Sequence, residues 1–174
     1  VDHFPDYSSV LQVFTDFVHS LAPDAFLIAC TDSPGVRDLL SQISRSDLRV
    51  ITYGQSGEYT LSHLSLAPSK SSARISRNGR VIGELLLPIP GEHNVFNAIA
   101  ALAAGIELGA DTSSLLEGLG SFTGARRRFE IKGIVNNIHV IDDYGHHPTE
   151  ITVTLQTAQR FAGTGKVHVI FQPH

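Results

Sequence analysis

The first fifty residues alternate between helical and strand patterns. From Tyr7 to Leu21, apolar side chains recur every three or four positions, which predicts an amphipathic helix with Ser8 or Ser9 as its N-cap. Two short apolar runs, Ala25–Cys30 and Leu48–Tyr53, are typical of buried strands, and a helical pattern lies between them. This order favours a parallel sheet, because such crossovers place a helix on a face of the sheet.

The middle of the chain changes to short segments of alternating polar and apolar residues. Within residues 58–90, the dipeptide Asn78-Gly79 separates two such segments and is a strong signal for a two-residue hairpin of type I′. A long alanine-rich helix is predicted from Asn94 to Leu108 with Gly109 as its end, and Asp111 is a candidate cap for a shorter helix. We therefore expect a small antiparallel patch followed by two packed helices.

A second α/β pattern begins after Phe122. It predicts strands at 129–134 and 138–142, a helix at 148–161 and a strand at 167–171. We place the domain boundary near Gly124, which assigns residues 1–124 to one domain and 125–174 to the next. The second set of elements is too small to close a sheet with helices on both faces, so we expect only the beginning of a larger domain.

Composition and charge exclude several classes of protein. The net charge of -4 and the pI of about 6.1 argue against a nucleic-acid partner, which needs a large basic surface. The longest apolar runs fall far below the roughly 20 residues of a membrane span. The single cysteine, Cys30, excludes an internal disulfide and fits a cytoplasmic protein. With Val1 at the start and no leader pattern after it, we expect an internal piece of a longer protein.

Two clusters of polar residues have side chains suited to a nucleotide. In the first, Gly91–Asn97, the spacing places Asn94 and Asn97 on one helix face, where their amide groups match the donors and acceptors of an adenine edge. From spacing alone, capping and first-turn residues are the more common explanation. The second cluster is Arg126–Arg128, and guanidinium groups bind phosphate through paired hydrogen bonds. A solvated basic turn is the alternative there.

A third cluster, Asp142–Glu150, follows a predicted strand and leads into a predicted helix. Ligand groups in α/β folds gather at this end of the strands. Two adjacent carboxylates and two adjacent imidazoles favour a functional role over packing. Since neighbouring side chains point in different directions, at most one of His146 and His147 is expected to face a substrate.

Five segments resemble the Mur ligase family in the same order along the chain: Asp2-His3, Gly91–Asn97, Gly124–Glu130, Asp142–Glu150 and Phe171–His174. The resemblance covers nearly the whole chain. It implies part of a central ATP-binding α/β domain with a small antiparallel β patch, followed by the beginning of a Rossmann-like C-terminal domain. The last two segments are most similar to family members that join L-alanine to UDP-N-acetylmuramate in peptidoglycan biosynthesis. Members that recycle murein tripeptide are one alternative, and a non-catalytic nucleotide-binding module is another.

The resemblance also implies a reaction and the residues that serve it. ATP would phosphorylate the muramyl carboxylate, and the amine of L-alanine would then attack the acyl phosphate, with Mg²⁺ and arginine neutralising the developing charge. The implied contacts are His93, Asn94 and Asn97 with adenine, Arg128 with the phosphates, Asp143 with the nucleotide, Tyr144, His146 and His174 with the substrates, and His3 with Mg²⁺. Arg128 and His146 are the implied catalytic residues. Because the chain has no Gly-x-x-x-x-Gly-Lys-Ser/Thr loop for the triphosphate, we expect it not to turn over by itself.

Overall fold

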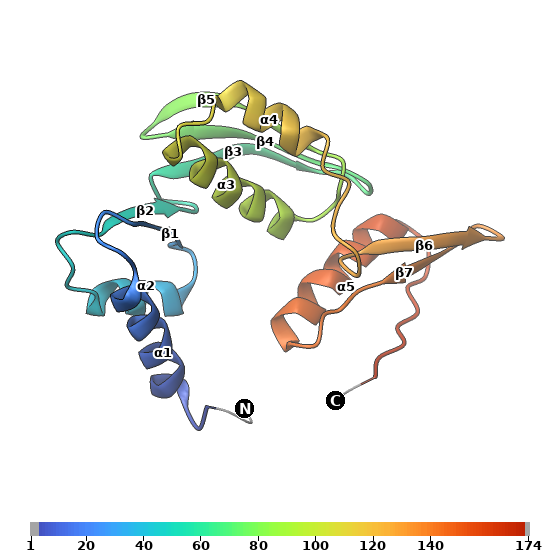
Figure 1. Ribbon diagram of the computed structural model, residues 1–174. Coiled ribbons are helices and arrows are strands. Elements are labelled where there is room, and N and C mark those ends of the chain that lie inside the picture. The colour runs from blue at the N-terminus through green and yellow to red at the C-terminus, as the bar shows by residue number, and fades with distance from the viewer. Residues whose placement is uncertain (1–3, 173–174) are drawn as a thin grey trace.

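The computed structural model describes residues 4–172, which form two α/β units joined by an extended linker, residues 121–129 (Figure 1). The elements are α1 (Tyr7–Ser20), β1 (Phe26–Cys30), α2 (Pro34–Gln42), β2 (Arg49–Tyr53), β3 (Tyr59–Leu66), β4 (Ser71–Arg77), β5 (Arg80–Leu87), α3 (Glu92–Glu107), α4 (Thr112–Gly120), β6 (Glu130–Val135), β7 (Ile138–Asp142) and α5 (Pro148–Ala162). Among these residues, no helix is long and apolar enough to cross a membrane.

The first five strands form one continuous sheet in the order β1-β2-β3-β4-β5. The pairs β1/β2 and β2/β3 are parallel, and the pairs β3/β4 and β4/β5 are antiparallel. The predicted antiparallel patch is therefore joined edge to edge with the parallel strands. Arg77 pairs with Arg80 across a two-residue turn in which Asn78 and Gly79 both have positive φ angles, which confirms the predicted hairpin.

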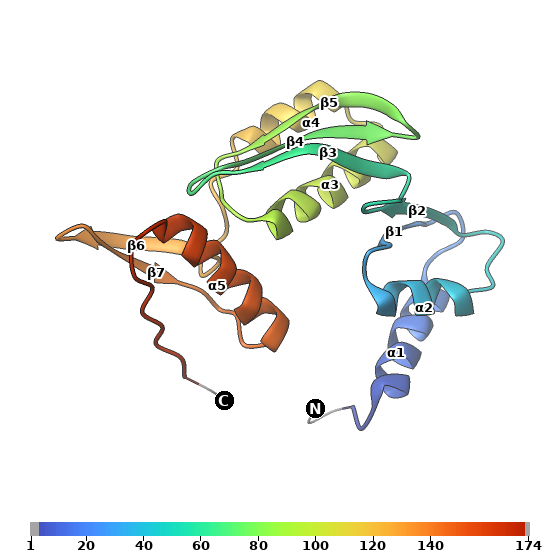
Figure 2. The same cartoon turned by 180° about the vertical axis from the view of Figure 1, so that it is seen from behind.

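Helices α3 and α4 cover one face of this sheet, as the opposite views of Figures 1 and 2 show. Val95, Ile99 and Leu102 recur at helical spacing on α3 and are fully buried against the strands. The two helices pack together as expected. They approach closely at Gly105, which has no side chain: a Cβ atom added there would lie only 2.6 Å from the Leu115 side chain.

Helices α1 and α2 pack on the opposite side of β1. Alternate residues of a strand point to opposite faces, so Phe26 and Ile28 join the core beneath α3 while Leu27 packs with the smaller cluster that contains Val18 and Leu39. The N-cap of α1 differs from the expectation. It is Asp6, whose carboxylate accepts a hydrogen bond from the Ser9 backbone N–H at 2.8 Å.

The second unit consists of the β6–β7 hairpin and α5. The ring of Phe161 on α5 packs edge-on against Phe129 and His139, with centroid distances of 5.7 and 5.0 Å. The strand predicted at residues 167–171 was wrong: this segment has no regular structure, and Ile170 is fully exposed. Its apolar pattern has strand propensity, but the hairpin's two strands pair only with each other within residues 4–172, so the segment has no ladder to join.

Candidate functional site

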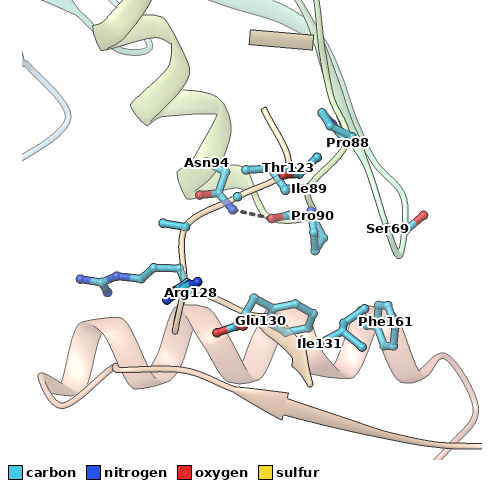
Figure 3. A pocket seen from close by; sticks show the side chains of 14 residues that line it. Ser69, Pro88, Ile89, Pro90, Asn94, Thr123, Arg128, Glu130, Ile131 and Phe161 are labelled. Carbon is cyan, nitrogen blue, oxygen red and sulfur yellow. Dashed lines mark hydrogen bonds between the residues drawn. The ribbon is translucent and has the colours of Figure 1, made fainter. Parts of the chain in front are cut away.

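A pocket of about 400 Å³ lies where the two units meet (Figure 3). Its walls come from the connection between β5 and α3, from the linker, and from β6 and α5. The units also touch directly beside it. A Cβ atom on Gly91 would lie 3.3 Å from Oγ1 of Thr157, a buried residue of α5. The pocket is therefore formed by both units together.

The start of α3 supplies one wall of the pocket. Asn94 lines it, and its side-chain Nδ2 donates a hydrogen bond to the carbonyl oxygen of Pro90 at 2.7 Å (Figure 3). This local contact fits the explanation of Asn94 as a capping residue, because it satisfies the Pro90 carbonyl just before the helix. Asn97 lies one turn further along α3, is exposed, and is not among the residues that line the pocket.

His93 faces the second unit. Its Nδ1 atom is buried and has no hydrogen-bond partner within residues 4–172. Burial lowers the pKa of the imidazole, the carboxylate of Asp143 opposes this shift, and the guanidinium of Arg128 reinforces it. A neutral ring with an unsatisfied nitrogen is suited to a ligand whose edge offers a matching donor or acceptor, such as a purine base.

The linker around Arg128 has an unusual backbone conformation. Arg127 and Phe129, on either side of it, have positive φ angles of 57° and 49°. For residues other than glycine this conformation costs on the order of 1–3 kcal/mol each, so surrounding contacts must hold it. The Phe129 N–H donates to Oδ2 of Asp143 at 2.9 Å, and the Tyr144 N–H donates to the Arg127 carbonyl at 2.8 Å.

The loop between β7 and α5 provides these contacts. Asp143 also accepts a hydrogen bond from the Gly145 N–H at 2.8 Å, so both of its oxygens bind backbone groups. The guanidinium of Arg127 lies 4.6 Å from the centre of the Tyr144 ring, a cation–π distance. The Tyr144 ring packs edge-on against the ring of His146 at 5.2 Å. The loop and the linker thus form one connected structure.

The two adjacent histidines differ in their contacts. His147 is the N-cap of α5, where its Nδ1 accepts a hydrogen bond from the Thr149 N–H at 3.2 Å. Glu150 completes a capping box by accepting from the His147 N–H at 3.3 Å. His146 is exposed and lies in the loop itself. The expectation that at most one of the pair faces a substrate remains a prediction, with His146 as the candidate.

Comparison with known proteins identifies the family. Residues 1–105 match the Mur ligase middle domain, and residues 127–174 match the Mur ligase glutamate ligase domain. The chain belongs to the Mur ligase family. The pocket therefore lies between two matched Mur ligase domains, with α4 and most of the linker in the interval that joins them. The division of the Mur ligase chain near Gly124 stays a prediction.

Individual relatives make the likeness more specific. The UDP-N-acetylmuramate–L-alanine ligases of Kineococcus radiotolerans and Acidothermus cellulolyticus are 44% and 43% identical over the whole of this chain, which spans 37% of the length of each. Among solved structures, the UDP-N-acetylmuramate–alanine ligase MurC of Thermotoga maritima is 34% identical, with a TM-score of 0.72 over 91% of this chain and 43% of that one. These relatives confirm the family expected from the sequence motifs, and the predicted α/β class is likewise confirmed.

A more distant structure shares only the fold. The MurF ligase of Thermotoga maritima in complex with ADP is 15% identical, with a TM-score of 0.74 over 91% of this chain and 36% of that one. Its likeness shows that the arrangement of elements extends across Mur ligases that differ in sequence.

The fold brings several of the predicted site residues of this Mur ligase chain together. Asn94 of the first unit and Arg128 of the linker line the same pocket, and the pKa of His93 responds to the charges of Arg128 and of Asp143 in the second unit. His3 and His174 lie outside the described residues. The sequence analysis missed the structural roles of His147 and Glu150. The available signal was the spacing of a capping box, but histidine stands where serine or threonine is usual.

A magnesium site is not provided by the described part of the chain. Within residues 4–172, no group of three or more histidine, cysteine, aspartate or glutamate side chains is placed to hold a metal ion. Mg²⁺ prefers oxygen ligands, but both oxygens of Asp143 already accept backbone hydrogen bonds. The described residues therefore do not fit a Mg²⁺ site by themselves.

Proposed function

We propose that this chain is the part of a UDP-N-acetylmuramate–L-alanine ligase that binds ATP between the middle domain and the glutamate ligase domain. The observation that carries the proposal is the pocket of about 400 Å³ at the junction, which Asn94 and Arg128 line, together with the buried His93 ring, whose pKa responds to the charges of Arg128 and Asp143. The identity of 44% with a ligase of that name supports the assignment. The boundary near Gly124, a cytoplasmic location and the individual residue roles are parts of the same proposal.

The proposed roles are those that the family resemblance implies, and the chemistry of each side chain is consistent with its role. His93 and Asn94 lie at the base, with Asn97 one helical turn further on, and Asp143 approaches the nucleotide from the second domain. Arg128 lies toward the phosphates, where its positive charge would stabilise the charge that develops as a phosphoryl group moves to the muramyl carboxylate. Tyr144, His146 and His174 are the proposed contacts of L-alanine and the muramyl group. Because both domains contribute, domain closure would complete the site.

Mg²⁺ would neutralise phosphate charge in this reaction. His3 is the proposed ligand from this chain, and oxygen ligands would have to come from elsewhere in the longer protein. The chain would not turn over by itself, because it lacks the loop that cradles a triphosphate.

The test is an assay of the longer protein that carries this chain, with ATP, Mg²⁺, UDP-N-acetylmuramate and L-alanine. We expect phosphate release that depends on L-alanine and a product whose mass equals that of UDP-N-acetylmuramoyl-L-alanine. Phosphate release with murein tripeptide in place of L-alanine would instead assign the recycling reaction. Tight ATP binding without turnover of either substrate would favour the non-catalytic module.

One comparison favours alanine over the tripeptide. The murein peptide ligase of Psychrobacter arcticus is 27% identical with a TM-score of 0.67, against 34% and 0.72 for the alanine ligase of Thermotoga maritima. Both values are higher for the alanine ligase.

A further inference from the structure

Glu150 makes contacts in three directions from the first turn of α5. Its Oε2 accepts hydrogen bonds from the N–H groups of His146 and His147 at 3.2 and 3.3 Å. Its Oε1 accepts a hydrogen bond from Nη1 of Arg128, in the linker, at 3.4 Å. In addition, Nδ1 of His146 lies 3.6 Å from Oε2. One carboxylate thus connects the helix, the loop before it and the linker.

A capping box alone would not require the contact with the linker. In a capping box, the third residue of the helix reaches back to the backbone N–H of the N-cap, and one carboxylate oxygen is enough for this. Here the second oxygen of Glu150 points to Arg128. The N–H groups of His146 and His147, with a smaller contribution from Arg128, lower the pKa of Glu150, and the positive end of the helix dipole also favours an anion at this place.

The neighbouring carboxylates are engaged elsewhere. Both oxygens of Asp143 bind backbone N–H groups, and Asp142 lies 3.6 Å from Nε of Arg127. Glu130 accepts from the Arg127 N–H and from Lys132. Among the described residues, the ion pair formed by Arg128 is the one with Glu150.

We propose that Glu150 is a positioning residue for Arg128, holding its guanidinium against the start of α5 so that Arg128 and His146 keep a fixed relation to each other. This inference rests on the proposed function, in which Arg128 meets the phosphates and His146 the substrates. The pair is partly exposed, with 53% of the Arg128 side chain and 34% of the Glu150 side chain accessible, so it contributes little to folding stability. The ion pair orients Arg128, so its loss should lower kcat/KM and leave the melting temperature nearly unchanged.

The variant that tests the proposal is Glu150→Gln in the longer protein. The glutamine oxygen can still accept from the N–H groups of His146 and His147, while its NH₂ group has no attraction for Arg128. We expect a fall of about tenfold in kcat/KM for ATP, since a misplaced charged group weakens transition-state stabilisation. The melting temperature should change little.

His147→Ala is the matched control. It removes the other half of the same capping box and leaves the pair of Arg128 with Glu150 in place. We expect it to lower the melting temperature as much as Glu150→Gln or more, with kcat/KM for ATP within about twofold of the unmodified protein. If His147→Ala lowers kcat/KM as much as Glu150→Gln does, Glu150 acts only as a helix cap and the proposal is wrong.

A double-mutant cycle identifies the partner through which Glu150 acts. Arg128→Ala and Glu150→Gln are measured singly and together, with the Kd of a non-hydrolysable ATP analogue as the readout, so that a slow reaction does not hide the result. We expect Glu150→Gln to weaken binding severalfold when Arg128 is present and by less than about twofold when it is absent. Equal effects in both backgrounds would overturn the proposal.

The unmodified protein separates the two hypotheses. If it joins L-alanine to UDP-N-acetylmuramate and the cycle shows no coupling, only the role of Glu150 is refuted. If it shows neither turnover nor ATP binding, the proposed function fails first, and the positioning role falls with it.

Discussion

Glu107, the last residue of α3, offers a sharp test of the energetics of the first unit. Its side chain is 4% exposed, and its carboxylate meets three groups: the guanidinium groups of Arg49 and Arg77 and the hydroxyl of Tyr59 at 3.2 Å. The contact with Nη2 of Arg77 is 2.5 Å long. Because these partners come from β2, β3 and β4, the carboxylate joins the end of the helix to three strands. We predict that Glu107→Gln destabilises the fold.

The expected loss of stability depends on how well Arg49 and Arg77 are compensated once Glu107 is neutral. Removing one member of a buried ion pair costs roughly 3–5 kcal/mol when the other charge is left unpaired in the interior. Here water solvates the largely exposed Arg49, and Arg77 retains its ion pair with Glu58 at 2.9 Å, so neither guanidinium is left as an unpaired buried charge. A negative charge at a helix C-terminus is itself unfavourable by about 0.3–1 kcal/mol, and this penalty disappears in the variant. We therefore expect a loss of about 2 kcal/mol.

The assay is urea unfolding followed by tyrosine fluorescence, because the chain has four tyrosines and no tryptophan. The matched control is Glu84→Gln, which breaks an ion pair of 2.7 Å with Arg74 on the surface, where 56% of the glutamate side chain is exposed. Exposed pairs contribute about 0–1 kcal/mol, so this control should unfold at nearly the same urea concentration as the unmodified chain. Equal losses for the two variants would refute the reasoning from burial.

Three further predictions test packing, titration and capping. Gly105→Ala should destabilise the chain by about 1–3 kcal/mol, because the added Cβ would lie 2.6 Å from Leu115; Gly118→Ala, in open space on α4, should be neutral or stabilising in the same urea experiment. Burial raises the pKa of Tyr59 to about 12, above the unfolded value near 10, so its contribution to stability is complete below pH 10 and is lost as the pH rises through 12. Tyr59→Phe should flatten this alkaline loss in unfolding curves measured from pH 9 to about 12, and an unchanged slope would contradict the assignment. Asp6→Ala should cost about 1 kcal/mol by removing the N-cap of α1, while Asp6→Asn, which keeps an acceptor for the Ser9 N–H, should cost less in thermal unfolding followed by circular dichroism.

Most helices and strands could be predicted because the spacing of apolar residues and the residues of caps and turns indicate them within a short stretch of sequence. The spacing of Val95, Ile99 and Leu102 indicates the buried face of α3, and Asn78-Gly79 supplies the two positive φ angles of its turn. The joining of β2 to β3 into one sheet was not visible, since strand pairing between segments is a tertiary contact. The segment 167–171 shows the opposite error. Strand propensity was present there, but a strand also needs a partner ladder.

The candidate site likewise has features that the sequence indicates and features that only tertiary contacts determine. Residue type and order indicated His93, Asn94, Arg128 and Asp143, because their chemistry is readable one residue at a time. The left-handed backbone on both sides of Arg128 was not readable, since only the contacts with Asp143 and Tyr144 make it stable.

The same contacts connect the two halves of the proposed site. The loop before α5 holds the linker backbone through Asp143, and Glu150 holds the Arg128 side chain, so two carboxylates fix the arginine. The segment Asp142–Glu150, which the sequence presents as a group of ligand-binding residues, therefore also serves as the frame that holds Arg128. If that view is correct, Asp143→Asn and Glu150→Gln should both loosen ATP binding, but only Asp143→Asn, which weakens the backbone contacts, should also make the linker more accessible to proteolysis. Equal protection of the linker in both variants would show that the frame does not depend on Asp143.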